Sequence, residues 1–316
     1  MRITLGVTDH AWADFLRARL DLDEVNFWVP SGRNFMGRAA LDEPFLFKTK
    51  SPRNTLVGGG FYAGFYERRV SEAWTVFGEA NGVSEEADLQ AAIQVYRARN
   101  QAPFSPDPTI GCLILRNVFF VEPLDELPQP LHWGRSIVQG KTYDSADPDW
   151  DYVQHAFESL AATPRIDISW EPKVAVEIAT ERYGPAALTR HRLGQGSFRL
   201  RVEDAYQSRC AISGSKVRPA LQAAHIRPYA QGGEHVVSNG LLLRSDMHTL
   251  FDKGYLGVTP DYTLRVSPRL RDEFGNGVEL YAKQDRGEVI HLPVQRDSLP
   301  AREHLEWHMD EVFKSA

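Results

Sequence analysis

The chain has 316 residues, of which 42% are hydrophobic and 25% are charged, and its formal net charge is −6. This length allows two domains of ordinary size, since a single hydrophobic core rarely grows that large. No apolar run is long enough for a signal peptide or a membrane span, so the sequence predicts a cytoplasmic protein with no membrane partner. Cys112 and Cys210 are too few for a disulfide framework.

The first 143 residues alternate strand and helix patterns. Residues 3–8 predict a strand and residues 9–20 a helix, with Thr8 or Asp9 as its cap. Three consecutive glycines at 58–60 fall inside a strand pattern, which indicates that another backbone or a ligand approaches closely there. The remaining patterns predict strands at 25–29, 44–50, 55–65 and 110–121 and helices at 71–77 and 84–99.

The pattern FW…PSGRNF…FLFK…VGGGF resembles the PUA-like group of domains, which includes the EVE, YTH and SRA families. The resemblance covers residues 1–143 and implies a small β-barrel with helices, whose aromatic pocket receives a flipped and often modified nucleobase. Alternatively, each aromatic ring simply fills the barrel core. The residues expected around the base are Phe27, Trp28 and Phe35, which would stack on it, and Asn26 and Asn34, which would bond to its edge.

Residues 144–190 predict a connector between two domains. Its first part, DPDWDYVQHAFESLAA, is a helix pattern with acidic residues at its start. Residues 173–182 fit a second helix, and Gly194-Gln195-Gly196 marks the hinge into a C-terminal domain at 191–316.

Basic side chains concentrate near the start of this second domain, although the whole chain is acidic. Residues 190–245 hold nine Arg or Lys against three acidic residues, and eight of the nine are Arg. The planar guanidinium suits phosphate, so this excess is compatible with a nucleic-acid partner. An ordinary solvated face could carry the same charge, so the excess indicates a nucleic-acid partner only together with a motif that points to one. The candidates for DNA phosphate contacts are Arg199, Arg201, Arg227 and Arg244.

The stretch 222–252, QAAHIRPYAQGGEHVVSNGLLLRSDMHTLFD, carries polar residues at an unusual spacing. His225, Asn239, His248 and Asp252 follow one another at intervals of 14, 9 and 4 residues. His225 ends a short apolar run, so it is expected at the end of a strand. His248 and Asp252 are four residues apart on a predicted helix, hence on one face, where they can share a cation.

This order and spacing resembles the HNH nucleases, whose ββα-metal site is two short strands, a loop and one helix around a single divalent metal. The blocks RLGQGSFR, CAISG, AAHIRP, GGEH, NGLLLRSDMHTLFDKG and LEWHMDEVF are similar, in order, to one HNH family often found at the C-terminus of bacterial restriction enzymes. The resemblance covers residues 191–316. The predicted fold class is therefore α+β, with a PUA-like barrel followed by an HNH domain.

The resemblance assigns catalytic roles to His225, Asn239 and His248. His225 would be the general base that takes a proton from water, a task for which the ordinary pKa of imidazole is suited. Asn239 would hold the loop that orients this base, although Asn-Gly is also a common turn. His235, in the GGEH loop, is expected to be an exposed loop histidine. Trp307 and the neighbouring His308 favour a packing role.

His248 and Asp252 are the expected metal ligands. An imidazole with a carboxylate suits Mg²⁺, Mn²⁺ or a later transition metal. Many HNH enzymes have Asp or His directly before the base as another ligand, whereas this chain has Ala224. Either Asp252 supplies the anion, or a more distant carboxylate such as Asp246 does. No structural zinc is expected, because Ser213 stands where a second thiolate would pair with Cys210.

These features together predict a modification-dependent DNA endonuclease of type IV restriction, which reads a modified cytosine such as 5-methylcytosine or 5-hydroxymethylcytosine and cuts double-stranded DNA with one divalent metal. One alternative is an HNH nuclease whose first domain reads DNA sequence or RNA. Another is a binding protein for modified DNA whose nuclease is silent. One HNH site cuts one strand, so a double-strand break would suggest a homodimer or two binding events.

Overall fold

The computed structural model describes residues 2–19, 22–37, 39–162, 195–228, 231–275, 287 and 289–315. The chain divides into two compact units, Met1–Leu193 and Gly194–Ala316. The helix predicted at 173–182 lies outside the described residues, as does Gly194 of the predicted hinge. Among the described helices, none combines the length and the apolar character that a membrane crossing requires.

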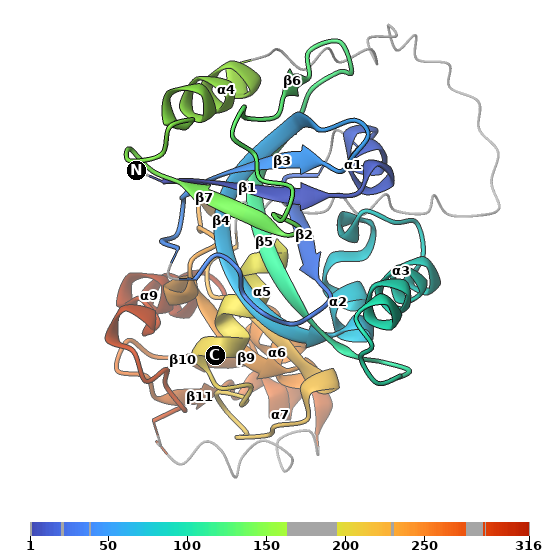
Figure 1. The fold of residues 1–316 in the computed structure, drawn as a ribbon. Helices are drawn as coiled ribbons and strands as arrows, with labels where there is room; N and C mark the ends of the chain where they lie inside the picture. Colours follow the sequence, from blue (N-terminus) through green and yellow to red (C-terminus); the bar gives the residue numbers. More distant parts are fainter. Residues whose placement is uncertain are drawn as a thin grey trace, which may run out of the picture. The chain divides into compact units, whose positions relative to one another are not determined.

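The N-terminal unit is built on one mixed sheet of seven strands (Figure 1). Six strands follow the order β2-β5-β4-β3-β1-β7, and β6 pairs with β4. β1 and β3 are parallel, and the other pairs are antiparallel. The strands are β1 (Ile3–Thr8), β2 (Glu24–Val29), β3 (Pro44–Thr49), β4 (Thr55–Arg69), β5 (Thr109–Phe120), β6 (Leu127–Pro128) and β7 (Gly140–Tyr143). The α+β class is confirmed, while closure into a barrel stays a prediction, because the strand order has two ends, β2 and β7, that are not paired with each other among the described strands.

The glycine run in β4 lies between β3 and β5, where backbones approach closely. A Cβ on Gly58 would lie 2.1 Å from the carbonyl oxygen of Phe119, and one on Gly59 would lie 2.5 Å from that of Phe45. Gly58 also has a φ of +152°, which side chains rarely adopt. The prediction that another backbone approaches this run is therefore confirmed.

Helices cover this sheet, and one of them comes from the predicted connector. They are α1 (His10–Arg17), α2 (Val70–Phe77), the 3₁₀ turn η1 (Gly78–Asn81), α3 (Glu86–Arg99) and α4 (Trp150–Ala162). α4 buries Val153, Phe157 and Leu160 in a cluster with Ile3 and Leu5 of β1. The described part of the predicted connector is thus packed into the N-terminal core, because the apolar residues of α4 share one face.

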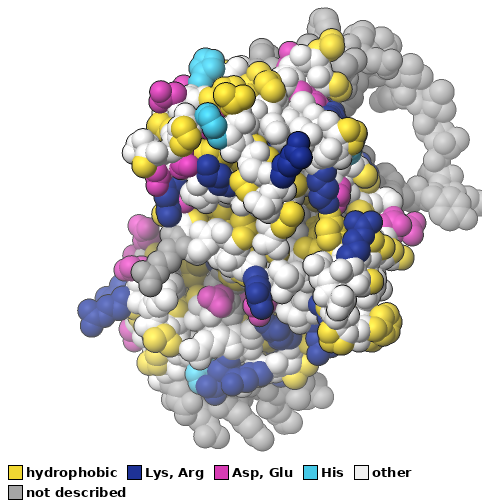
Figure 2. All heavy atoms as spheres, viewed as in Figure 1, with side chains coloured by type: hydrophobic (Ala, Val, Ile, Leu, Met, Phe, Trp, Pro, Cys, Tyr) yellow, Lys and Arg dark blue, Asp and Glu magenta, His cyan; other side chains and the backbone are white. Residues whose placement is uncertain are grey.

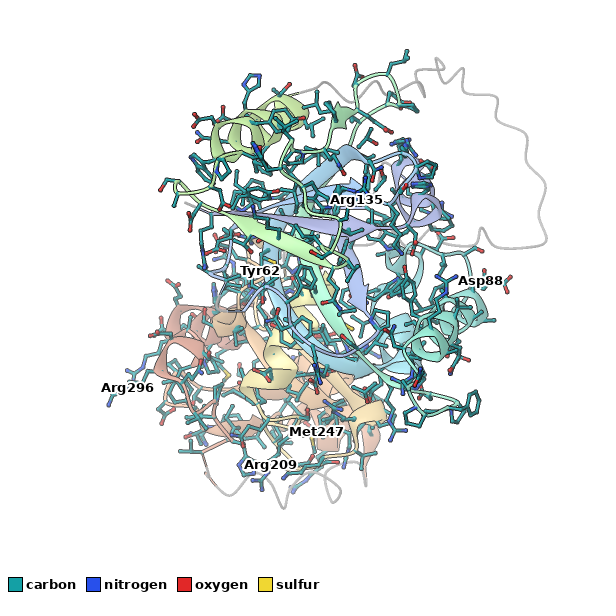
Figure 3. The ribbon with its side chains drawn as sticks, in the orientation of Figure 1. Tyr62, Asp88, Arg135, Arg209, Met247 and Arg296 are labelled. Carbon is teal, nitrogen blue, oxygen red and sulfur yellow. The ribbon has the colours of Figure 1, made fainter. Side chains whose placement is uncertain are left out.

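The C-terminal unit has the strand, loop, strand and helix arrangement that the motif predicts. β8 (Leu221–His225) pairs antiparallel with β9 (Gly240–Arg244), and α6 (Ser245–Asp252) follows at once. α5 (Gln195–Ala205) and α6 both contact both strands. The three leucines of β9 are fully buried between them, which explains why the strand reads as a continuous apolar run. Met247 of α6, labelled in Figure 3, is fully buried in the same core.

The remaining elements surround this centre. They are the 3₁₀ turns η2 (Arg218–Ala220), η4 (Val237–Asn239) and η5 (Arg296–Ser298), the strands β10 (Leu256–Val258) and β11 (Leu264–Val266), and the helices α7 (Arg269–Phe274) and α9 (Arg302–Glu311). Gly254 ends α6 with a φ of +74°, and a Cβ there would lie 2.0 Å from the carbonyl oxygen of Val312, just after α9. α6 is therefore held against the end of the chain.

Candidate functional site

His225 stands at the last position of β8, as predicted, and its ring is held from two sides. The ring of Phe198 on α5 stacks on it with centroids 3.9 Å apart and planes 12° apart. Its Nε2 lies 2.8 Å from Nδ1 of His235. The stack fixes the plane of the imidazole, and the hydrogen bond fixes its rotation within that plane.

His235 is therefore not the exposed loop histidine that the sequence predicts. Its side chain is half-buried, and its ring meets that of His225 edge to face at 73°. His235 is held inward by a residue outside the loop. Arg201 of α5 donates from Nη2 to the carbonyl oxygen of His235 at 2.7 Å. Only the position of His235 between the two motif residues, His225 and Asn239, could have suggested this placement.

Asn239 is fully buried and holds the loop between β8 and β9 through three hydrogen bonds. Its Oδ1 accepts from the backbone N–H of Arg227 at 2.9 Å, and its Nδ2 donates to the carbonyl oxygens of Arg227 and Glu234, each at 2.9 Å. A Cβ on Gly233 would lie 1.9 Å from the same carbonyl oxygen of Arg227. This geometry fits the positioning role expected of Asn239, because the amide ties both ends of the loop that presents His235.

His248 and Asp252 share one face of α6, with Nε2 and Oδ2 3.3 Å apart. The Nδ1 of His248 lies 2.8 Å from Oε1 of Gln222 on β8. A carbonyl oxygen only accepts, so Nδ1 carries the proton and the neutral ring has its lone pair on Nε2, beside the carboxylate. Two such donor atoms attract a common cation, and metal-bound histidines commonly have an outer partner of this kind. The pair therefore fits a divalent ion.

The surroundings of this pair show which other groups can contribute. Asp246 pairs with Arg244 through two bonds of 2.6 and 2.7 Å, so Asp252 is the carboxylate next to His248. Ala224 is fully buried and contributes no ligand. Among the described residues, no three His, Cys, Asp or Glu side chains are grouped to hold a metal ion. Cys210 is buried, with its sulfur accepting a backbone N–H from Arg244 at 3.3 Å.

The four candidate phosphate arginines are engaged within the unit. Arg199 pairs with Glu203 at 3.0 Å, and Arg244 is paired as described above. Arg227 donates from Nε to the carbonyl oxygen of Gln231 at 2.6 Å. On the face drawn in Figure 2, the Lys and Arg side chains of the described residues are scattered rather than gathered in one patch. Arg201 and Arg227 thus hold the backbone of the loop after β8, and phosphate contacts stay a prediction.

The N-terminal unit contains a cavity of about 840 Å³, a size typical of small-ligand sites. Phe27, Trp28 and Phe35 of the predicted base pocket line it, although Phe27 is only 7% exposed. Trp28 donates from Nε1 to the carbonyl oxygen of Asn81 at 3.0 Å and meets the ring of Tyr96 edge-on. This wall is therefore aromatic and fixed in orientation.

The two asparagines expected at the edge of a bound base do not line this cavity. Asn26 is fully buried and donates from Nδ2 to Oδ1 of Asn81 at 2.8 Å, on the same face of β2 as Trp28, which donates to the backbone of Asn81. Asn34 caps its own turn by accepting from the N–H of Met36 at 2.9 Å. Neither placement supports a contact with a base.

The polar residues that line the cavity include Asp9, Lys50 and Tyr96. The carboxylate of Asp9 accepts from Nζ of Lys50 at 2.5 Å and from the hydroxyl of Tyr96 at 2.8 Å. Asp9 stands at the N-cap of α1, as predicted, yet its side chain makes no capping bond. Its carboxylate is instead bonded to Lys50 and Tyr96, a placement that became visible only with the structure.

The comparisons with known proteins agree with the arrangement of the C-terminal unit. Residues 210–259 match the family described as HNH endonuclease, so this unit carries an HNH endonuclease domain. HNH nucleases generally use a divalent metal. No curated protein matches the chain.

Solved structures give weaker likenesses. A modification-dependent TagI restriction endonuclease is 25% identical over 37% of this chain and 38% of its own, with a TM-score of 0.27. The ASCH protein from Zymomonas mobilis is 11% identical over 46% of this chain and 89% of its own, with a TM-score of 0.31. The match spans well under half of the TagI chain, and these scores carry no conclusion about this protein.

Proposed function

We propose that the protein is a modification-dependent DNA endonuclease, in which a PUA-like N-terminal unit reads a flipped, modified cytosine and the HNH unit cuts the backbone. The observation that carries the proposal is the presence, in one chain, of an HNH domain and of an aromatic cavity of about 840 Å³ in the other unit. An HNH site contacts mainly phosphate, which carries no sequence information, so discrimination must come from elsewhere. The cavity is the candidate for that second task.

Each catalytic role falls to a residue of the C-terminal unit. His225 takes the proton from the attacking water, and Asn239 holds the loop that orients it. His248 and Asp252 hold the divalent ion, which when bound neutralises charge on the scissile phosphate and the leaving oxygen. Whether the ion is Mg²⁺, Mn²⁺ or a transition metal is decided by titration with each.

In the reader, Trp28 stacks on the flipped base while Asp9 accepts from its exocyclic amine. A carboxylate is the usual acceptor for the N4 amine of cytosine. Stacking on an aromatic ring contributes roughly 1–3 kcal/mol per base, which offsets much of the few kcal/mol that unstacking costs.

The decisive experiment is digestion of matched duplexes that contain cytosine, 5-methylcytosine or 5-hydroxymethylcytosine, with Mg²⁺ or Mn²⁺. We expect cleavage of one or both modified duplexes and survival of the unmodified one. Equal cleavage of all three would refute the reader and favour a domain that reads sequence or RNA. Selective binding without any cleavage would identify a silent nuclease.

Two variants separate the units in the same assay. His225→Ala is expected to abolish cutting while leaving selective binding intact. Trp28→Ala is expected to make modified and unmodified duplexes equivalent, whereas Trp28→Phe, which keeps a ring, is expected to retain discrimination. Sedimentation of the protein on its substrate then tests whether a homodimer assembles for a double-strand break.

A further inference from the structure

The hydrogen bond between His225 and His235 gives the general base a partner of its own. Each imidazole nitrogen in an N···N hydrogen bond is either the donor or the acceptor, and the 2.8 Å distance requires one of each. If His225 donates, its Nε2 carries the proton and its Nδ1 carries the basic lone pair. If His235 donates, the lone pair of His225 on Nε2 is occupied by that bond.

We propose that His235 is a positioning residue that accepts the Nε2–H of His225 and thereby keeps the lone pair of the base on Nδ1. The inference rests on the proposed role of His225 as the base. When that lone pair takes a proton from water, His225 becomes an imidazolium, and its bond to the Nδ1 of His235 becomes charge-assisted and stronger. His235 therefore stabilises the protonated base and also orients the neutral one. A residue that orients the base plays the same part in other active sites that pair a nucleophile with a general base.

Two side chains hold the backbone of the loop at His235 and at the residue before it. Arg201 donates to the carbonyl oxygen of His235 itself at 2.7 Å, and Asn239 donates to that of Glu234 at 2.9 Å. The ring of His235 also meets Phe198, the residue that stacks on His225, with centroids 5.8 Å apart. Three elements, α5, β8 and the turn before β9, thus converge on one nitrogen-to-nitrogen bond.

Two substitutions at 235 distinguish acceptor chemistry from simple packing. In His235→Asn, the Oδ1 oxygen takes the place of Nδ1 and still accepts a hydrogen bond, although the side chain is smaller. In His235→Phe, the aromatic ring is kept and the acceptor is lost. We expect the Phe variant to nick plasmid about 100-fold more slowly, near the lower end of what general-base catalysis contributes, and the Asn variant to stay within about tenfold of wild type.

The tautomer of His225 supplies a readout that does not depend on cutting. ¹⁵N NMR of the full-length wild type and of the Asn variant is expected to show His225 protonated at Nε2, and that of the Phe variant a mixture of tautomers. His225→Ala identifies the resonance. Melting curves of the two His235 variants establish that both are folded.

The outcomes separate this inference from the proposed function. No cutting of any plasmid by the wild type would refute the nuclease proposal and the positioning role with it. A wild type that cuts beside an equally active Phe variant would overturn only the role of His235. Equal loss in the Asn and Phe variants, or a His225 tautomer protonated at Nδ1 in the wild type, would overturn it as well.

Discussion

Asn239→Asp is the sharpest test of how the loop after β8 is held, because it replaces one donor group by an acceptor without changing the shape of the side chain. Oδ1 can still accept from the N–H of Arg227. The second oxygen, however, would face the carbonyl oxygens of Arg227 and Glu234 where Nδ2 now donates to both at 2.9 Å. Two part-buried hydrogen bonds are lost, and the new carboxylate oxygen is left without a donor at a fully buried position.

The size of the effect follows from the burial of this amide. A buried polar group left without its partner costs about 1–3 kcal/mol, so the orphaned oxygen at position 239 lowers the free energy of unfolding by at least roughly that amount. We expect urea denaturation to show this loss and plasmid nicking to fall by at least tenfold, because the loop also presents His235. Gln231→Ala is the control, since Gln231 is exposed and bonds Arg227 through its backbone. An Asp variant as stable and as active as this control would refute the role of Asn239 in holding the loop.

Three further predictions address the ion, the cavity and the packing of α6. Gln222→Leu is expected to weaken Mn²⁺ binding about tenfold in calorimetric titration, because the Nδ1 of His248 loses its hydrogen-bond partner. Unchanged affinity would show that Gln222 does not orient His248 for the ion. Asp9→Asn is expected to reduce the binding of modified duplex about tenfold with little change in melting temperature, and equal binding would remove Asp9 from base recognition. Burial lowers the pKa of His308 to about 4 in the folded protein. As the pH falls below 6.5, this histidine therefore takes up a proton in the unfolded chain before it does so in the folded one. The free energy of unfolding falls progressively down to pH 4, by about 3 kcal/mol in total. Urea unfolding across this range should show a smaller loss for His308→Gln, and identical losses would contradict the assignment.

The sequence predicted the parts of the site that depend on local spacing. The strand ending at His225 and the helix carrying His248 and Asp252 four residues apart both follow from short-range patterns. The packing role of His308 was also predicted, and the structure confirms it with a ring stacked on Phe251 at 3.7 Å.

The missed features depend on contacts between residues far apart in the chain. Asp9 was interpreted only as a helix cap, but Lys50 and Tyr96, 41 and 87 residues away, draw its carboxylate toward the cavity. Asn26 was expected at the pocket with its neighbours Phe27 and Trp28, whereas the side chain of Asn81, 55 residues away, accepts from its amide. The parallel pairing of β1 with β3 is likewise set by the tertiary fold and has no signature in either strand alone.

The two halves of the C-terminal site differ in how much of the chain they need. The proposed ion-binding pair is local to α6, within the 210–259 region that matches the HNH family, and has Gln222 of β8 beside it. The proposed base stacks on Phe198, and Arg201 holds the backbone of His235; both residues lie on α5, upstream of that match. Substitutions in α5 should therefore disturb the orientation of His225 while leaving ion affinity unchanged, whereas substitutions in α6 should do the reverse. This separation explains why the motif alone identified the chemistry but could not identify what holds the base.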